Sequence, residues 1–193
     1  RTSIASVKAI APFLYKNGIK FIMCFNMPEE RRFMHLDTVF SIINNDEALV
    51  FPPFFDKHDA QELDVDILTI SNEKSISSKR LKANLAFNEL GIDIDFINCG
   101  GSLRLDQERE QWTDGANAFC LSPGKIIVYD RNINTLSELE KCGYKIVHWK
   151  ENLSKYRFSK TDSQKIAITI ESGELSRGRG GPRCMTMPIN RKI

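Results

Sequence analysis

The chain has 193 residues, of which 41% are hydrophobic and 27% are charged, a composition typical of a soluble globular protein. Its 27 basic and 25 acidic residues leave a net charge of only +2. The basic residues do not cluster with aromatic ones, so the sequence argues against a nucleic-acid partner. No apolar run approaches the roughly 18 residues of a membrane helix, and we expect no membrane partner.

The cysteines favour a reducing compartment. Five of them stand at irregular spacing, at positions 24, 99, 120, 142 and 184. Their odd number and the lack of a CxxC pair argue against a disulfide framework and against a zinc site, so we expect free thiols, no metal and a cytoplasmic protein. The sequence opens on Arg1 rather than Met, which we interpret as a sign that the chain is a fragment.

The first elements are predicted from periodicity. Helical spacing of apolar residues predicts a helix over 3–17, closed by Gly18, and a strand over 19–24 follows. In HLDTVFSII, residues 35–43, alternation with period two predicts a strand that has His35 and Asp37 on one face. A turn at 44–46 then leads to a partner strand at 48–51.

The rest of the chain suggests a repeated unit. The predicted segments are a strand at 67–70, a helix at 78–90, strands at 92–97, 118–121 and 125–129, a helix at 135–142, and strands at 144–149 and 165–170. The order strand, turn, strand, helix, strand thus occurs twice, which is typical of a stacked or radial α/β architecture. The polar, aperiodic residues 150–164 are predicted to be a surface insertion.

Cys184 has unusual neighbours for a free thiol. It ends a glycine-rich loop that carries Arg177, Arg179 and Arg183, and nearby cations lower a thiol pKa toward the reactive thiolate. The glycines of the loop allow a positive φ and a close approach of the backbone to a ligand. We therefore consider a nucleophilic role for Cys184 and interpret the other four cysteines as small buried hydrophobes.

Two further groups of polar residues are candidates. His35 and Asp37, if they share a face, suit a proton carrier beside a fixed negative charge. The stretch WTDGAN, residues 112–117, places Asp114 and Asn117 just before a predicted strand, where a plain turn is the simpler interpretation. The P-loop and dinucleotide-binding fingerprints are both absent from the sequence.

Four motifs together resemble the arginine deiminase family of the guanidino-group-modifying superfamily. They are MHLDTVF (34–40), EREQWTDGAN (108–117), SPGKIIVYDRN (122–132) and ELSRGRGGPRCMTMP (174–188). The family fold is a five-bladed α/β propeller built of ββαβ units. The resemblance implies that residues 1–193 form a single catalytic-type domain fragment, the C-terminal part of such a propeller.

The resemblance also implies a reaction: metal-free and cofactor-free hydrolysis of L-arginine to L-citrulline and ammonia. Cys184 matches the family nucleophile, His35 its proton-shuttling histidine and Asp37 a carboxylate that holds the guanidinium group. The residues that match substrate-binding positions of the family are Arg179, Gly178, Arg1 and Asn117.

The match to the family is incomplete. No motif here corresponds to the second guanidinium-binding aspartate or to the catalytic glutamate, so we expect a missing N-terminal half or a second copy as partner. The alternative is a truncated, inactive relative that serves as a binding or structural fragment. Amidino transfer and dimethylarginine hydrolysis are further possibilities within the superfamily, but the motifs around Cys184 and His35 favour the deiminase.

Overall fold

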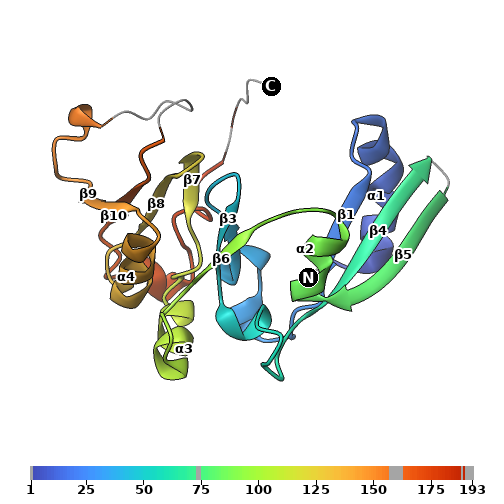
Figure 1. Ribbon diagram of the computed structural model, residues 1–193, viewed down its shortest axis with the longest axis horizontal. Coiled ribbons are helices and arrows are strands. Elements are labelled where there is room, and N and C mark those ends of the chain that lie inside the picture. The colour runs from blue at the N-terminus through green and yellow to red at the C-terminus, as the bar shows by residue number, and fades with distance from the viewer. Residues whose placement is uncertain (1, 73–74, 157–162, 188, 190–193) are drawn as a thin grey trace. The chain divides into compact units, whose positions relative to one another are not determined.

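The computed structural model describes residues 2–72, 75–156, 163–187 and 189. The protein is a mixed α/β structure with three sheets in this described part of the chain (Figure 1). It divides into two compact units, Arg1–Glu29 with Pro53–Asp93 and Glu30–Pro52 with Ile94–Ile193. The expectation of one catalytic-type domain over residues 1–193 stays a prediction.

The first unit is a three-stranded antiparallel sheet with two helices. The strands are β1 (Phe21–Phe25), β4 (Asp64–Asn72) and β5 (Ser75–Lys82), in the order β1-β4-β5, and the helices are α1 (Ile4–Lys16) and α2 (Ala83–Glu89). The side chain of Ser3 caps α1 by accepting a hydrogen bond from the Ser6 amide at 3.1 Å. The predicted helix over 3–17 is thus confirmed.

The predicted helix over 78–90 is wrong in its first half. Residues up to Lys82 continue β5, which pairs with β4 from Asp64↔Lys82 onward, and only Ala83–Glu89 is helical. The buried face of α2 rests on Ala83, Ala86 and Phe87. The ladder to β4 decides the state of the preceding residues, which local periodicity does not reveal.

The second unit contains the other two sheets. One has the order β2-β3-β6, with β2 (Phe40–Ile42), β3 (Glu47–Val50) and β6 (Asp95–Asn98). The other has the order β7-β8-β10-β9, with β7 (Phe119–Ser122), β8 (Lys125–Tyr129), β9 (Lys145–His148) and β10 (Ile166–Ile170). The helices are α3 (Arg104–Trp112) and α4 (Ile133–Lys141). Short 3-10 helices are η1 (Arg31–Phe33), η2 (Leu36–Thr38), η4 (Leu153–Lys155) and η5 (Leu175–Gly178), and a further one, η3 (Pro52–Phe54), lies at the boundary of the units.

One apolar core joins the two sheets of the second unit. Its members come from both sheets, from the residues next to their strand ends and from α4: Ile43, Leu49, Ile97, Ala118, Ile126, Val128, Leu139, Tyr144 and Ala167. The helix contributes Leu139, which is fully buried. Because these residues exclude water from both sheets at once, the loops at the sheet ends are held in fixed positions, and the candidate site lies in those loops.

The two sheets share a pattern of pairing. In each, an antiparallel hairpin (β2 with β3, β7 with β8) is followed by a strand parallel to the second strand of the hairpin (β6, β10). The two predicted hairpins are present, but the predicted repeat differs from the structure: α2 belongs to the first unit, and β10 rather than β9 pairs with β8. The propeller that the family resemblance implies stays a prediction. Helix α3 was missed, because its residues RLDQEREQW are almost all polar and show no apolar stripe.

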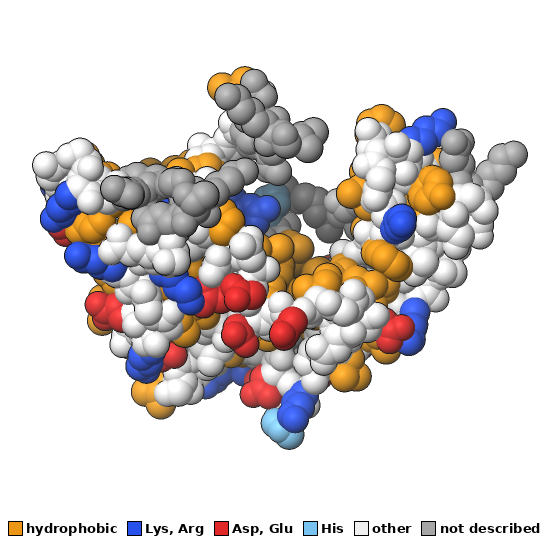
Figure 2. Space-filling model, turned by 45° about the horizontal axis from the view of Figure 1, so that its top comes forward, with side chains coloured by type: hydrophobic (Ala, Val, Ile, Leu, Met, Phe, Trp, Pro, Cys, Tyr) orange, Lys and Arg blue, Asp and Glu red, His pale blue; other side chains and the backbone are white. Residues whose placement is uncertain are grey.

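The surface carries charges of both signs. Lys and Arg side chains lie in several separate places on the face shown in Figure 2, in keeping with the net charge of +2. Of the predicted insertion at 150–164, residues 157–162 lie outside the described residues; the described part includes η4. None of the helices in the described part of the chain has the length and apolarity needed to cross a lipid bilayer.

Candidate functional site

Three segments that are far apart in the sequence meet at Cys184. The thiol of Cys184 donates a hydrogen bond to Oδ2 of Asp37 over 3.5 Å. The side-chain amide of Asn117 donates to Sγ of Cys184 over 3.2 Å and to the backbone oxygen of Asp37 over 3.1 Å. Three of the quoted motifs therefore supply one cluster of polar groups, all within the second unit.

Asn117 is the centre of this cluster. Its side chain is only 1% exposed, and its Oδ1 accepts a hydrogen bond from the Arg183 amide over 2.8 Å. The backbone of Gly181 lies so close that a Cβ there would be 2.3 Å from Cγ of Asn117. The loop that leads to Cys184, the cysteine loop (residues 177–184), is thus fixed next to the start of β7 by the buried side-chain amide of Asn117. Only a glycine fits at position 181.

His35 and Asp37 do not lie on a strand, so that prediction is wrong. Asp37 belongs to η2, and His35 is the exposed residue before it, with its carbonyl oxygen accepting from Oγ1 of Thr38 over 2.6 Å. The turn is held from α3, where Nε2 of Gln111 donates to the carbonyl oxygen of Thr38 over 3.3 Å. A short stretch with alternating polarity fits such a turn as well as a strand, and the contact with Gln111 decides between them.

The pKa of Cys184 is raised, contrary to the expectation from its arginine neighbours. Burial raises it most; a backbone hydrogen bond from Gly181 opposes this, and the Asp37 carboxylate raises it again. The guanidinium of Arg177 is bound instead to Glu174 over 2.8 Å. Arg177 therefore does not offset the effects of burial and of Asp37 on the sulfur, and in this state the thiol form is favoured.

Arg179 is the residue of the loop with a left-handed backbone, at φ 64°. The flanking glycines 178, 180 and 181 do not have a positive φ, so the conformational reason we expected for them is wrong at these positions. The Arg179 guanidinium donates hydrogen bonds to the carbonyl oxygens of Trp112 and Arg32, the latter over 2.7 Å. It lies 4.6 Å from the centroid of the Trp112 ring. These contacts offset the free-energy cost of the left-handed backbone at Arg179. Gly178, the last residue of η5, is exposed.

Asp114 is a site residue whose role the sequence did not indicate. Its side chain is 1% exposed, its φ is 59°, and both carboxylate oxygens are buried without a hydrogen-bond partner. Burial raises its pKa to about 6; the Arg179 guanidinium opposes that rise and the Asp37 carboxylate adds to it. The Asp-Gly dipeptide in WTDGAN was the available signal, since Asp tolerates a left-handed turn.

The remaining predicted features are placed as follows. Cys99 is buried and burial raises its pKa to about 12, as expected of a structural thiol. Cys142, which we expected to be buried, is exposed at the end of α4. Arg1 lies outside the described residues. Among the residues that the structure describes, no three His, Cys, Asp or Glu side chains are grouped so as to hold a metal ion.

Comparison with known proteins agrees with the motifs gathered at this site. A sequence model of the arginine deiminase family matches residues 1–191. The chain is 38% identical to the arginine deiminase of Listeria innocua over 99% of its own length, and 34% identical to that of Mycoplasma capricolum over 100%. It spans 42% of the length of each of these relatives. The chain belongs to the arginine deiminase family.

Proposed function

We propose that this chain carries the nucleophile of an arginine deiminase, which hydrolyses L-arginine to L-citrulline and ammonia. The observation that supports the proposal best is the meeting of Cys184, Asp37 and Asn117 at distances of 3.1 to 3.5 Å from segments up to 147 residues apart. A thiol that shares a solvent-accessible site with a carboxylate suits attack on a cationic guanidinium group. The membership of the family supplies the substrate class.

The proposed chemistry has two balanced steps. The Cys184 thiolate forms a bond to the guanidinium carbon, and ammonia leaves with a proton delivered by His35. Water then attacks the resulting thiouronium carbon and gives its proton to His35, the carbon–sulfur bond breaks, and citrulline is released with the thiolate restored. In this scheme a bound guanidinium takes the place of the thiol proton on Asp37, and its positive charge counteracts the raised pKa of Cys184.

The substrate contacts follow the same proposal. Arg179 and, through its backbone, Gly178 would lie by the amino-acid part of the substrate, together with Arg1. Asn117 would line the site and position Cys184, since its amide already contacts the sulfur and the backbone of Asp37. Holding a planar guanidinium between a carboxylate and a nucleophile supplies the orientation that such an attack needs.

We propose further that the two sheets of the second unit are blades of a partial α/β propeller. Their shared hairpin-plus-parallel-strand pairing supports this. Because the chain spans 42% of its relatives, the missing carboxylates would come from the remaining part of the enzyme. We therefore expect little turnover from these 193 residues alone.

The test uses the two exposed cysteines as a matched pair. The chain is incubated with L-arginine, alone and after co-expression with the part of the Listeria innocua relative that it does not cover. We expect an arginine-derived adduct on the Cys184 peptide by mass spectrometry and citrulline release from the co-expressed pair, both lost in Cys184→Ser and kept in Cys142→Ser. If neither adduct nor citrulline forms in any sample, the chain is the binding or structural fragment instead.

A further inference from the structure

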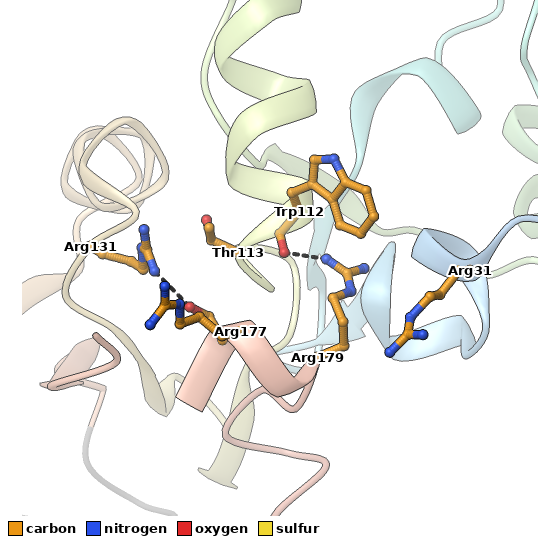
Figure 3. Close-up of a pocket in the computed structure, with 7 residues that line it drawn as sticks. Arg31, Trp112, Thr113, Arg131, Arg177 and Arg179 are labelled. Carbon is orange, nitrogen blue, oxygen red and sulfur yellow. Dashed lines mark hydrogen bonds between the residues drawn. The ribbon is translucent and has the colours of Figure 1, made fainter. Parts of the chain in front are cut away.

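A pocket in the second unit is lined in part by the cysteine loop. Its volume is about 420 Å³, and seven residues line it: Arg31, Trp112, Thr113, Arg131, Ser176, Arg177 and Arg179. In the view of Figure 3, Arg131 and Arg177 lie together at one end, and Arg179 lies between Trp112 and Arg31. Asp37, Asn117 and Cys184 are not among the lining residues, and Arg179 is the lining residue that the pocket shares with the substrate contacts proposed above.

The charged side chains that line this pocket are all positive. Four of its seven lining residues are arginines, and the described residues that line it include no Asp or Glu. Arg131 is held in place by a hydrogen bond from its Nη1 to Oγ of Ser176 over 2.7 Å. Arg177 bonds to the exposed carboxylate of Glu174, outside the pocket lining, over 2.8 Å. The carboxylates of Glu174 and Asp114 act on Arg177 and Arg179, so the two carboxylates offset only part of the positive charge of the four arginines. An anion in the pocket would neutralise the remainder.

We propose that this pocket binds a phosphoryl group, either as free phosphate or as part of a phosphorylated metabolite. Guanidinium groups present paired N–H donors that match the oxygens of a phosphate. Several such forks around one hollow suit a tetrahedral dianion with three or more free oxygens better than a carboxylate with two. The Trp112 ring, already stacked by Arg179 at 4.6 Å, adds an aromatic wall for the group attached to the phosphate.

The position of the pocket couples it to the cysteine loop. Arg177 and Arg179 belong to η5 and its C-terminal cap, five to seven residues before Cys184. An anion bound between Arg177 and Arg131 would hold η5 against the segment after β8, and with it the start of the loop. The site goes beyond the proposed deiminase chemistry, because binding there needs neither Cys184 nor a missing part of the enzyme.

Binding to the pocket is measured by the fluorescence of Trp112. In a Trp149→Phe background Trp112 is the one remaining tryptophan, and its fluorescence is titrated with sodium phosphate, AMP, sodium sulfate and sodium acetate at constant ionic strength. We expect saturable changes with phosphate, AMP or both, about tenfold weaker in Arg31→Gln and in Arg177→Gln. Response to AMP alone would identify a phosphorylated metabolite as the ligand, and equal response to both would identify the phosphoryl group itself.

Two control variants make the outcome decisive. Arg109→Gln removes the same charge from an exposed position of α3 outside the pocket and should bind as the parent does. Glu174→Gln releases the Arg177 guanidinium and should tighten binding. Acetate that binds as tightly as phosphate, or affinity unchanged in both pocket variants that retain the parent circular dichroism spectrum, would overturn the proposal. Neither readout depends on arginine turnover, so a failure here is separate from a failure of the deiminase function.

Discussion

Replacing Gly181 by alanine should release the cysteine loop from the body of the second unit. A Cβ at this position would lie 2.3 Å from both Cγ and Oδ1 of Asn117, far inside the contact distance of real atoms. Asn117 is 1% exposed and cannot move outward without leaving its partners. The substitution therefore removes the hydrogen bonds that join Asn117 to Asp37, Cys184 and Arg183.

The size of the effect follows from those three bonds. A hydrogen bond within a protein contributes about 1 kcal/mol net, and a weak one to sulfur contributes less, so the loop loses about 2 to 3 kcal/mol. This loss raises the population of the open loop roughly 30- to 150-fold. The loop stays attached through Tyr129, whose hydroxyl donates to the Gly180 carbonyl oxygen. We accordingly expect local opening rather than unfolding of the unit.

Limited trypsin digestion measures the opening, because the loop itself supplies cleavage sites at Arg179 and Arg183. Cleavage there follows the open population when the loop opens and closes quickly, and the fragments are counted by mass spectrometry. Gly178→Ala is the matched control, since a Cβ at Gly178 meets no atom within 4 Å. Equal cleavage of the Gly181→Ala and Gly178→Ala variants would refute the role assigned to the contact with Asn117.

Three further predictions concern pH and stability. The pKa of Asp114 is raised to about 6 from 3.8, so ionisation of this carboxyl lowers the free energy of unfolding as the pH rises from about 4 to above 6. Asp114→Asn should remove this loss, which is about 3 kcal/mol at pH 7, in urea titrations at pH 4 and 7. An unchanged dependence of stability on pH in the variant would contradict the assignment. The Asp37 carboxylate raises the pKa of Cys184. In a Cys142→Ser background, Asp37→Asn should therefore lower the pKa of Cys184 and speed its labelling by iodoacetamide at pH 8. Slower labelling would contradict the direction of the effect assigned to Asp37. The buried carboxylate of Glu110 accepts hydrogen bonds from two backbone N–H groups in the first turn of α4, at 2.9 and 2.8 Å. Glu110→Gln should therefore lower the free energy of unfolding, measured in urea, by about 2 kcal/mol. The control Arg109→Gln should change it by less than about 0.5 kcal/mol.

The family and much of the local structure can be predicted from the sequence alone. The motifs around Cys184 and His35 are specific enough to identify an arginine deiminase relative, and the family match over residues 1–191 confirms it. Helix α1, the β7–β8 hairpin and α4 follow from capping, turn and periodicity signals. These signals act over a few neighbouring residues, so they can be read without knowing what packs against them.

The construction of the site could not be predicted in this way, because it depends on contacts between distant segments. The turn that holds Asp37, the extension of β5 through Lys82 and the burial of Asp114 depend on partners that are distant in the sequence. The raised pKa of Cys184 has the same origin: burial and Asp37 act on the sulfur, while Arg177 is bound to Glu174. Electrostatic effects fall off with distance in space rather than along the chain, and three-dimensional packing sets those distances.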